Sequence, residues 1–293
     1  MNKLVIFGVG LIGGSVALAL KRATAAPHVV GVGRSGESLQ AALSLGVIDA
    51  VETDAKAALM DADMVIIATP VAQTSCILSA ITPYLNTRTV VTDVGSTKTD
   101  IIHHAQTILG DKISQFVPGH PIAGAEKSGV TAARADLFDG KNIVLTPMDA
   151  TDRQALERVR KLWETTGARV SEMSASNHDN IFAAVSHLPH LLAFALVDEI
   201  ASRANATQLF YFAASGFRDF TRIAGSSPEM WRDISLANRE ALLNELAAYQ
   251  DELAALSKLL QNSDGPGLQA LFERASYARN NWAHAQQHHT KQK

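Results

Sequence analysis

A chain of 293 residues with 47% hydrophobic and 19% charged residues has the composition of a folded globular protein, which excludes a disordered or fibrous one. Its formal net charge of -3 gives no reason to expect nucleic acid or an anionic membrane as a partner. The single cysteine, Cys76, excludes an internal disulfide framework and a cysteine-based metal site. Since no run of about 18 apolar residues occurs and Met1 leads directly into a strand-like segment, we expect a cytoplasmic protein without a membrane span.

The first half of the chain alternates short β-branched runs with helical patterns, which predicts βαβ units around a parallel sheet. Strands are expected at residues 4–7, 29–32, 64–68, 89–92, 115–117, 143–146 and 168–170. Helices are expected near residues 11–22, 37–45, 73–84 and 98–109. A further helix should start at a Thr151 cap, run through Trp163 and stop at Gly167.

From Ser174 onward the sequence shows helical periodicity and almost no strand signal. Pro189, Pro228 and the Gly-Pro-Gly turn at 265–267 are expected to be the main breaks, and one long helix is expected over residues 234–260. The predicted architecture is therefore an α/β Rossmann-like domain over residues 1–172, followed by an all-α domain over residues 173–293.

Gly8, Gly10 and Gly13 form a G-x-G-x-x-G pattern directly after the first expected strand and at the start of the first expected helix. In that context the glycines allow a tight turn and a close approach of the backbone to a pyrophosphate, which binds the N–H groups of the helix N-terminus. Leu11 and Ile12 lie within this cofactor-binding turn. A glycine-rich turn without a ligand is the less favoured alternative.

The end of the second expected strand bears on the choice of cofactor. An enzyme that prefers NAD usually has Asp or Glu about 20 residues past the last glycine, where it binds the ribose 2′-hydroxyl. Here that position is Gly33, followed by Arg34 and Ser35. A cation without an acidic neighbour suits the 2′-phosphate of NADP, so we expect NADP to be preferred, with NAD possible. The alternative is a solvated arginine in an enzyme that accepts either cofactor.

Three polar segments are candidates for the reaction site. Residues 93–98 (DVGSTK) and 119–126 (GHPIAGAE) each follow an expected strand, at the sheet edge where open α/β folds bind ligands. Residues 186–190 (SHLPH) lie in the helical half, with Arg218, Arg222 and Trp231 further along the chain.

With these motifs the sequence resembles the prephenate/arogenate (cyclohexadienyl) dehydrogenase family over nearly its whole length. The resemblance rests on GVGLIGGS at 8–15, ATP at 68–70, DVGSTK, GHPIAGAE, HDNIFAAVSHLPHLLAFAL at 178–196 and GFRDFTRIAGSSPEMWRDI at 216–234. It implies a Rossmann-like domain joined to a helical dimerisation domain, and hence a homodimer. It also places Thr69 and Pro70 of the ATP segment beside the cofactor. Neither a preceding chorismate mutase domain nor a following regulatory domain is expected.

The resemblance implies oxidative decarboxylation of prephenate or arogenate, with hydride transfer from ring C4 to the nicotinamide. The product would be 4-hydroxyphenylpyruvate or tyrosine. His120 matches the family's catalytic histidine, which hydrogen-bonds the C4 hydroxyl; a structural histidine at the strand end is the alternative. Ser96 matches the family serine that contacts this histidine and the nicotinamide region, although it also suits a simple helix N-cap.

On the substrate side, Arg222 matches the family arginine that binds a carboxylate, and His187 matches a histidine that lines the substrate side chain. Glu126 corresponds to an acidic residue at the mouth of the site, with an exposed helix-start glutamate as the alternative. Trp231 is expected to pack the pocket wall, and His190 to lie at the helix surface or behind the substrate contacts.

No metal is expected, because the His284 and His288 pair lacks a third ligand and the reaction does not need one. Within enzymes, the rival interpretation is a β-hydroxyacid dehydrogenase or imine reductase, which normally relies on a catalytic Lys or Tyr in the helical half. Outside enzymes, the rival is a dinucleotide-binding sensor without chemistry. Ala125 stands where many relatives have a hydroxyl residue, and the preference between prephenate and arogenate stays open.

Overall fold

The computed structural model describes the backbone of residues 1–23, 26–125 and 127–291, and the side chains as far as residue 285. The chain divides into two compact units, Met1–Leu242 and Leu243–Lys293. The first unit contains the sheets and all candidate site residues that the structure describes.

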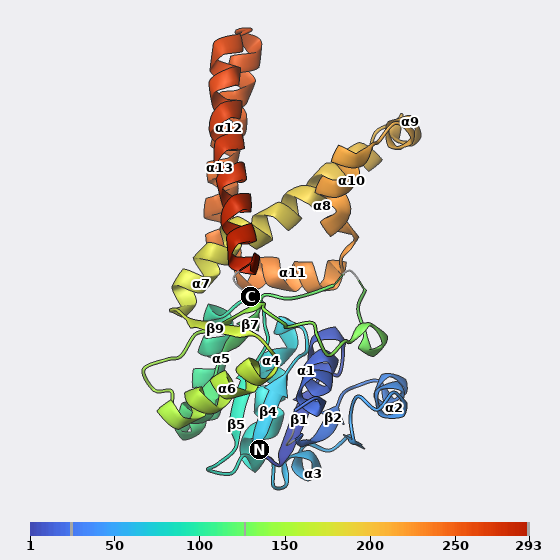
Figure 1. Ribbon diagram of the computed structural model, residues 1–293, viewed down its shortest axis with the longest axis vertical. Helices are drawn as coiled ribbons and strands as arrows, with labels where there is room; N and C mark the ends of the chain where they lie inside the picture. The colour runs from blue at the N-terminus through green and yellow to red at the C-terminus, as the bar shows by residue number, and fades with distance from the viewer. Residues whose placement is uncertain (24–25, 126, 292–293) are drawn as a thin grey trace. The chain divides into compact units, whose positions relative to one another are not determined.

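The first unit is built on a six-stranded parallel sheet with the order β3-β2-β1-β4-β5-β6 (Figure 1). Its strands are β1 (Lys3–Phe7), β2 (His28–Val32), β3 (Ala50–Glu52), β4 (Met64–Ile67), β5 (Val90–Asp93) and β6 (Phe116–Val117). The strand order reverses between β1 and β4, and a crevice outside the carboxyl ends of strands at such a point is where α/β sheets bind ligands.

Helices cover both faces of this sheet, which is why its strands are apolar on both sides. They are α1 (Leu11–Lys21), α2 (Gly36–Ser44), α3 (Ala55–Leu59), α4 (Thr74–Ile81), α5 (Thr99–Leu109) and α6 (Arg153–Thr165). Successive β1 side chains point to opposite faces. Leu4 and Ile6 belong to one core cluster with Trp163 of α6, whereas Val5 belongs to the other with Leu78 of α4.

A second, three-stranded sheet follows, in which β7 (Gly119–Pro121) pairs antiparallel with β8 (Asn142–Leu145) and β8 pairs parallel with β9 (Arg169–Glu172). Short 3-10 helices occur at η1 (Val71–Gln73), η2 (Thr82–Tyr84), η3 (Gly110–Gln115) and η4 (Val130–Ala132). Because β7 comes two residues after β6, the end of the large sheet delivers the chain directly into the small one.

Beyond β9 the described residues form helices and no strand. They are α7 (Ala175–Phe182), the π-helical turn η5 (Ala183–His187), α8 (Leu188–Ala201), α9 (Ala206–Tyr211), α10 (Ser215–Thr221), η6 (Arg222–Gly225), α11 (Pro228–Ala237), α12 (Arg239–Gln261) and α13 (Gly265–Lys291). The second unit comprises the part of α12 from Leu243 on, a turn at 262–264 and α13. The predicted fold class, a Rossmann-like domain followed by helices, is confirmed, whereas the domain boundary at residue 172 stays a prediction.

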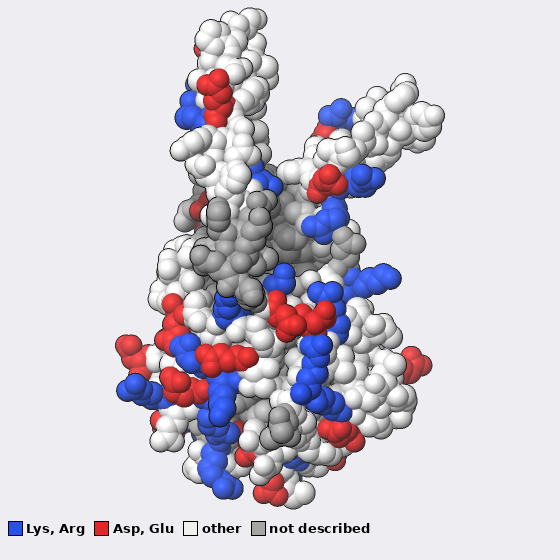
Figure 2. All heavy atoms as spheres, in the orientation of Figure 1, with Lys and Arg blue, Asp and Glu red and all other residues white. Residues whose placement is uncertain are grey.

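One helical segment, Ala175–Ala201, is long and apolar enough by composition to cross a membrane, with a mean hydropathy of 1.6. Only 28% of its most apolar window is buried within one copy of the chain. Core helices of soluble proteins meet the same criterion. Figure 2 shows acidic and basic side chains interspersed over the visible face of the sheet-containing domain, rather than a continuous surface of one sign.

Three predicted local features are wrong. Thr151 does not cap α6: Asp152 does, accepting from the Ala155 backbone N–H at 2.9 Å, while Thr151 donates to the Phe116 carbonyl. Pro189 does not break the helix, because it lies within the first two positions of α8, just after the π-helical turn. The long helix expected over 234–260 is interrupted at Asn238, which separates α11 from α12.

Candidate active site

The turn between β1 and α1 is shaped by its glycines. Gly8 has φ of 93°, and a Cβ there would lie 2.6 Å from the Ala68 carbonyl oxygen. A Cβ on Gly13 would lie 2.3 Å from the Gly8 carbonyl oxygen, whereas one on Gly10 would meet nothing within 4 Å. The first and third glycines are therefore required by packing, and the second faces open space. Backbone can approach a ligand closely at that position.

The N-terminus of α1 completes a candidate anion-binding cradle. Gly10 is its N-cap residue and supplies no side-chain hydrogen bond, and the first turn has no acidic residue. Its N–H groups and positive dipole end are therefore left for a ligand, as a pyrophosphate requires. Leu11 and Ile12 are half-buried and pack against the core, so they would contribute their backbone rather than their side chains.

Two other loops border the cradle. After β4, the Thr69 hydroxyl is buried without a hydrogen-bond partner among the described residues, and Pro70 is exposed. After β2, Arg34 and Ser35 are exposed. Ser35 caps α2 by accepting from the Ser38 N–H at 3.3 Å, and Arg34 forms no ion pair within the described part of the chain. A buried, unpaired hydroxyl and an available cation beside this cradle fit a dinucleotide.

The sequence predicts that His120 lies in a loop, because it follows an expected strand. That prediction is wrong, since His120 lies on the short strand β7. Its backbone pairs with Val144 of β8, which fixes the direction of the ring. The ring is half-buried, and Phe182 of α7 lies against it with ring centroids 5.0 Å apart. Burial lowers the pKa of His120 well below its ordinary value, and the charges of His178 and Lys98 lower it further. The imidazole is therefore neutral at neutral pH.

A buried ion pair holds β7 against the end of β5. Lys98 and Asp93 are 0% and 1% exposed, and the Lys98 ammonium contacts the Asp93 carboxylate while donating to the Gly119 carbonyl at 2.8 Å. Asp93 also accepts from the Gly119 N–H at 3.1 Å and the Gly95 N–H at 2.7 Å. Removing one partner would leave a buried charge unpaired, so the residue next to His120 is rigidly held.

α7 supplies two polar residues that the sequence analysis did not single out. His178 is fully buried, and its Nε2 lies 2.8 Å from Nδ1 of His120. Its Nδ1 lies 2.8 Å from the Asp179 carboxylate, which also accepts from the backbone N–H groups of Lys98 and Thr99. The signal that could have found them is an ionisable pair inside an apolar helical block, since such groups are rarely buried unless they are paired.

His187 ends the π-helical turn and is 1% exposed. Asn238 donates through Nδ2 to the Asp179 carbonyl at 2.8 Å and approaches the His187 Nδ1 at 3.1 Å. Because an amide nitrogen only donates, Nδ1 of His187 accepts and its proton is on Nε2. That Nε2 is buried. Burial lowers the pKa of His187 to about 4, so this group is a neutral hydrogen-bond donor.

A third histidine, His190, lies against the expected pocket-wall residue Trp231 and near Arg222. His190 stacks on Trp231 with ring centroids 3.7 Å apart, and the Arg222 charge lowers the pKa of His190 beyond the larger effect of burial. Trp231 packs against the sheet core, and its Nε1 is buried without a partner in the described part of the chain. His190 is half-buried, as expected for a residue behind the substrate contacts rather than at the helix surface.

The remaining predicted residues are less defined. Ser96 is half-buried in the loop after β5, where a hydrogen bond with its backbone raises the pKa of His187 against the larger effect of burial. It is not the N-cap of α5, a position that Lys98 occupies. Glu126 lies outside the described residues. The structure therefore gathers His120, His178, His187, Asn238 and the loop after β5 at the carboxyl edge of the sheet.

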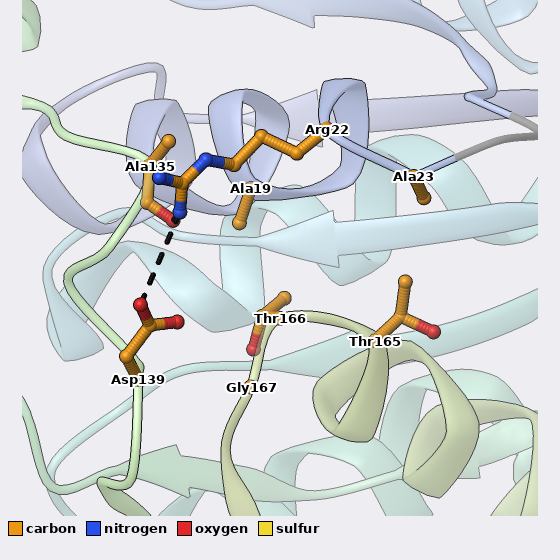
Figure 3. Close-up of a pocket in the computed structure, with 8 residues that line it drawn as sticks. All are labelled: Ala19, Arg22, Ala23, Ala135, Asp139, Thr165, Thr166 and Gly167. Atoms are coloured by element: carbon orange, nitrogen blue, oxygen red, sulfur yellow. Dashed lines mark hydrogen bonds and ion pairs between the residues drawn. The ribbon is translucent and has the colours of Figure 1, made fainter.

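A separate surface cavity of about 360 Å³ lies elsewhere, at the C-terminal ends of α1 and α6 (Figure 3). Arg22 and Asp139 form an exposed ion pair of 4.0 Å across it, and Thr165, Thr166 and Gly167 line the other side. Its lining holds no histidine. It also lies at the opposite end of α1 from the dinucleotide cradle, so it is not the reaction site.

Comparison with known proteins gives a consistent result over both parts of the chain. Residues 16–172 match the model of the prephenate dehydrogenase nucleotide-binding domain, and residues 174–274 match that of the prephenate dehydrogenase dimerization domain. The chain is 40% identical over 276 residues to prephenate dehydrogenase of Bacillus subtilis, which covers 94% of this chain and 74% of that protein. It is 35% identical to cyclohexadienyl dehydrogenase of Zymomonas mobilis, with 94% of each covered.

Solved structures of similar fold bear the same names. Prephenate dehydrogenase of A. aeolicus, in complex with hydroxyphenyl propionate and NAD+, is similar with a TM-score of 0.90 and 37% identity, over 95% of this chain and 97% of that one. Synechocystis arogenate dehydrogenase is similar with a TM-score of 0.80 and 30% identity, over 96% of this chain and 99% of that one.

Proposed function

Because the chain belongs to the prephenate and arogenate dehydrogenase family of NAD(P)-dependent oxidoreductases, we propose that it oxidatively decarboxylates prephenate, arogenate or both. The products are 4-hydroxyphenylpyruvate and tyrosine respectively. One observation supports this reaction above the rivals: a neutral, half-buried His120 stands at the carboxyl edge of the sheet that also carries the dinucleotide cradle. A sensor without chemistry has no need of such a base, and a lysine- or tyrosine-dependent reductase would not use one.

Oxidation of the ring carbinol removes a proton from the hydroxyl oxygen and a hydride from the ring carbon. When bound, the oxidised nicotinamide supplies the hydride acceptor. His120 accepts the hydroxyl proton on Nε2, the ring nitrogen that His178 does not engage. As the carboxylate leaves as carbon dioxide, its bonding electron pair completes the aromatic ring, and His120 returns the proton to the ring oxygen. Ser96 lies in the loop that borders this histidine and orients the same hydroxyl.

The substrate carries two carboxylates, and its binding groups lie on the helices. Arg222, at the start of η6, binds one carboxylate through its planar guanidinium. Trp231 offers a buried Nε1–H that is unpaired among the described residues, and His187 offers a buried Nε2–H. We assign His187 to the substrate side chain and Trp231 to the pocket wall. Glu126 is proposed for the mouth of the site, on the family resemblance alone.

The cofactor is NAD(P), held by Gly8–Gly13, Thr69 and Pro70, and we propose that NADP is preferred. The support is the exposed Arg34 with no carboxylate at Gly33. Prephenate dehydrogenase of A. aeolicus has been solved in complex with NAD+, so membership of the family does not by itself imply a preference for NADP.

The protein is proposed to act as a cytoplasmic homodimer. The match of residues 174–274 to a dimerization domain supports the assembly. So does the exposure of large apolar side chains on α9 and the residue after it, where Tyr211 is 82% and Phe212 73% exposed. The exposed, unpaired thiol of Cys76 suits a reducing compartment.

The test is turnover by the purified protein with prephenate or arogenate, each with NADP+ or NAD+. We expect reduced nicotinamide and carbon dioxide to form in equal amounts with at least one substrate. Reduction without carbon dioxide release, or turnover of β-hydroxy acids or imines instead, would replace this proposal by one of its rivals. Inertness with every substrate would favour the sensor.

A further inference from the structure

Three side chains in series lead from the proposed proton acceptor into the protein. Nδ1 of His120 lies 2.8 Å from Nε2 of His178, and Nδ1 of His178 lies 2.8 Å from Oδ1 of Asp179. His178 is fully buried and Asp179 is 5% exposed. Since bulk water cannot replace these partners, the direction of each hydrogen bond is set by the groups themselves.

The direction follows from the carboxylate. Burial raises the pKa of Asp179, but hydrogen bonds from His178 and from the Thr99 and Lys98 backbone bring it below its ordinary value, so the group is ionised. An ionised carboxylate only accepts, so Nδ1 of His178 carries a proton. Burial lowers the pKa of His178 despite the opposing effect of Asp179, so the ring is neutral and its Nε2 has a lone pair. That lone pair accepts from Nδ1–H of His120, which leaves Nε2 of neutral His120 unprotonated.

We propose that Asp179 and His178 are positioning residues, which hold His120 in the tautomer whose Nε2 accepts the substrate hydroxyl proton. This inference rests on the proposed function. The O–H bond breaks as the N–H bond forms, and His120 becomes an imidazolium whose Nδ1–H still donates to His178. The carboxylate of Asp179, at the far end of the series, stabilises that positive charge until the proton returns to the ring oxygen. Buried carboxylates fix histidine tautomers in hydrolytic triads by the same physics.

A purely structural role predicts something different. Asp179 also accepts from the first N–H groups of α5, at 2.9 Å from Lys98 and 2.8 Å from Thr99. If capping were its whole contribution, a variant that keeps these bonds would keep its turnover number.

Two variants separate these roles. Oδ1 of Asp179 accepts from both His178 and the Lys98 N–H, and Oδ2 accepts from the Thr99 N–H. In Asp179→Asn the oxygen can keep the Thr99 bond while the NH2 takes the place of Oδ1 and donates to His178, at the loss of the Lys98 bond, whereas His178→Gln leaves both bonds to α5 in place. His178 must then accept on Nδ1 and donate from Nε2, so His120 accepts on Nδ1 and has its proton on Nε2. We expect kcat to fall by roughly 10²–10⁴-fold, the range for lost proton transfer, with KM and the NADP+ dissociation constant little changed. Asp111→Asn, which removes an exposed carboxyl just beyond the C-terminal end of α5, is the control and should keep its kcat.

Nitrogen-15 NMR of labelled histidines measures the tautomers without any substrate. In the wild-type protein with NADP+ bound, the His120 signal, assigned by its loss in a His120 variant, should show a protonated Nδ1 and a bare Nε2. The pattern should be reversed in Asp179→Asn. Should that variant not fold, His178→Gln breaks the same series and should show the same loss of kcat.

A folded Asp179→Asn with wild-type kcat, or a wild-type His120 protonated on Nε2, would overturn the inference. Wild-type protein that is inert with both substrates would instead refute the proposed function, and the NMR measurement would still decide the tautomer.

Discussion

Gly33 and Arg34 lie at the end of β2, where we propose that the enzyme distinguishes the two nicotinamide dinucleotides. A Cβ on Gly33 would lie 3.6 Å or more from the Leu39 side chain, which is ordinary contact, so an aspartate can be introduced there without a clash. Arg34 is exposed and forms no ion pair within the described residues, so its charge is available to a 2′-phosphate.

Arg34→Ala should therefore lower kcat/KM for NADP roughly 10- to 150-fold. This factor corresponds to about 1.5–3 kcal/mol, the contribution of a hydrogen bond to a charged group. The value for NAD should hardly change, and Gly33→Asp should shift the preference toward NAD through the ribose hydroxyls. Arg22→Ala, an exposed arginine at the far end of α1, is the control. Equal losses with both cofactors in Arg34→Ala, or a wild-type preference for NAD, would show that this strand end has been misinterpreted.

At the residue scale, the sequence identifies groups that stand in recognisable motifs, and it misses those defined only by burial. His120, Arg222 and the cradle glycines could be named because their motifs are local. Asp179 and Asn238 could not be named in this way, because their roles depend on contacts that are distant in sequence. Asp179 accepts from the backbone of Lys98, 81 residues away, and Asn238 contacts His187, 51 residues away. No periodicity or spacing rule reports that kind of contact.

At the scale of elements, the strands and long helices follow from apolar patterning, and the wrong predictions fall where tertiary contacts override local preference. Asn238 ends α11 with a conformation of φ -107° and ψ 33°, while its side chain binds both the Asp179 carbonyl and His187. Pro189 is accommodated because its missing N–H falls in the first turn of α8. The π-helical turn before it has no sequence signature of its own, and such turns are frequent at functional sites.

The short strand β7 is a second element whose structure is set by tertiary contacts rather than by its own sequence. Three residues are too few for a strand pattern, and the segment becomes a strand only because β8 lies beside it. Its consequence is functional, since a strand position holds His120 more firmly than the expected loop would. A candidate site at the sheet edge could thus be proposed from sequence, while the rigidity of this strand could not.

At the scale of the whole molecule, the proposed homodimer can be tested in solution. We expect a dimer at micromolar concentration in sedimentation experiments. The double variant Tyr211→Glu and Phe212→Glu should shift it toward the monomer, because burying charges in an apolar interface is costly. Leu45→Glu places a charge on a residue that is 56% exposed on the sheet-containing domain, and it should leave the dimer intact. A monomeric wild-type protein would contradict the assembly.

We propose that His120, as a neutral base, accepts the hydroxyl proton. Its pKa is lowered in the folded protein by burial and by the charges of His178, Lys98 and His187. The active, unprotonated form therefore predominates at neutral pH, and kcat/KM should stay constant until the pH falls through a value well below 6.5.

The most direct measurement is the pH profile of His120→Asn beside that of the wild-type protein. Asparagine keeps a hydrogen-bonding group but cannot take the proton. We predict that kcat drops by roughly 10²–10⁴-fold. The acid limb should also disappear, and NADP+ should bind with unchanged affinity because we propose that Gly8–Gly13 hold the pyrophosphate. A variant with near-normal kcat and the acid limb intact would contradict the account and place the base elsewhere, with His187 as the next candidate.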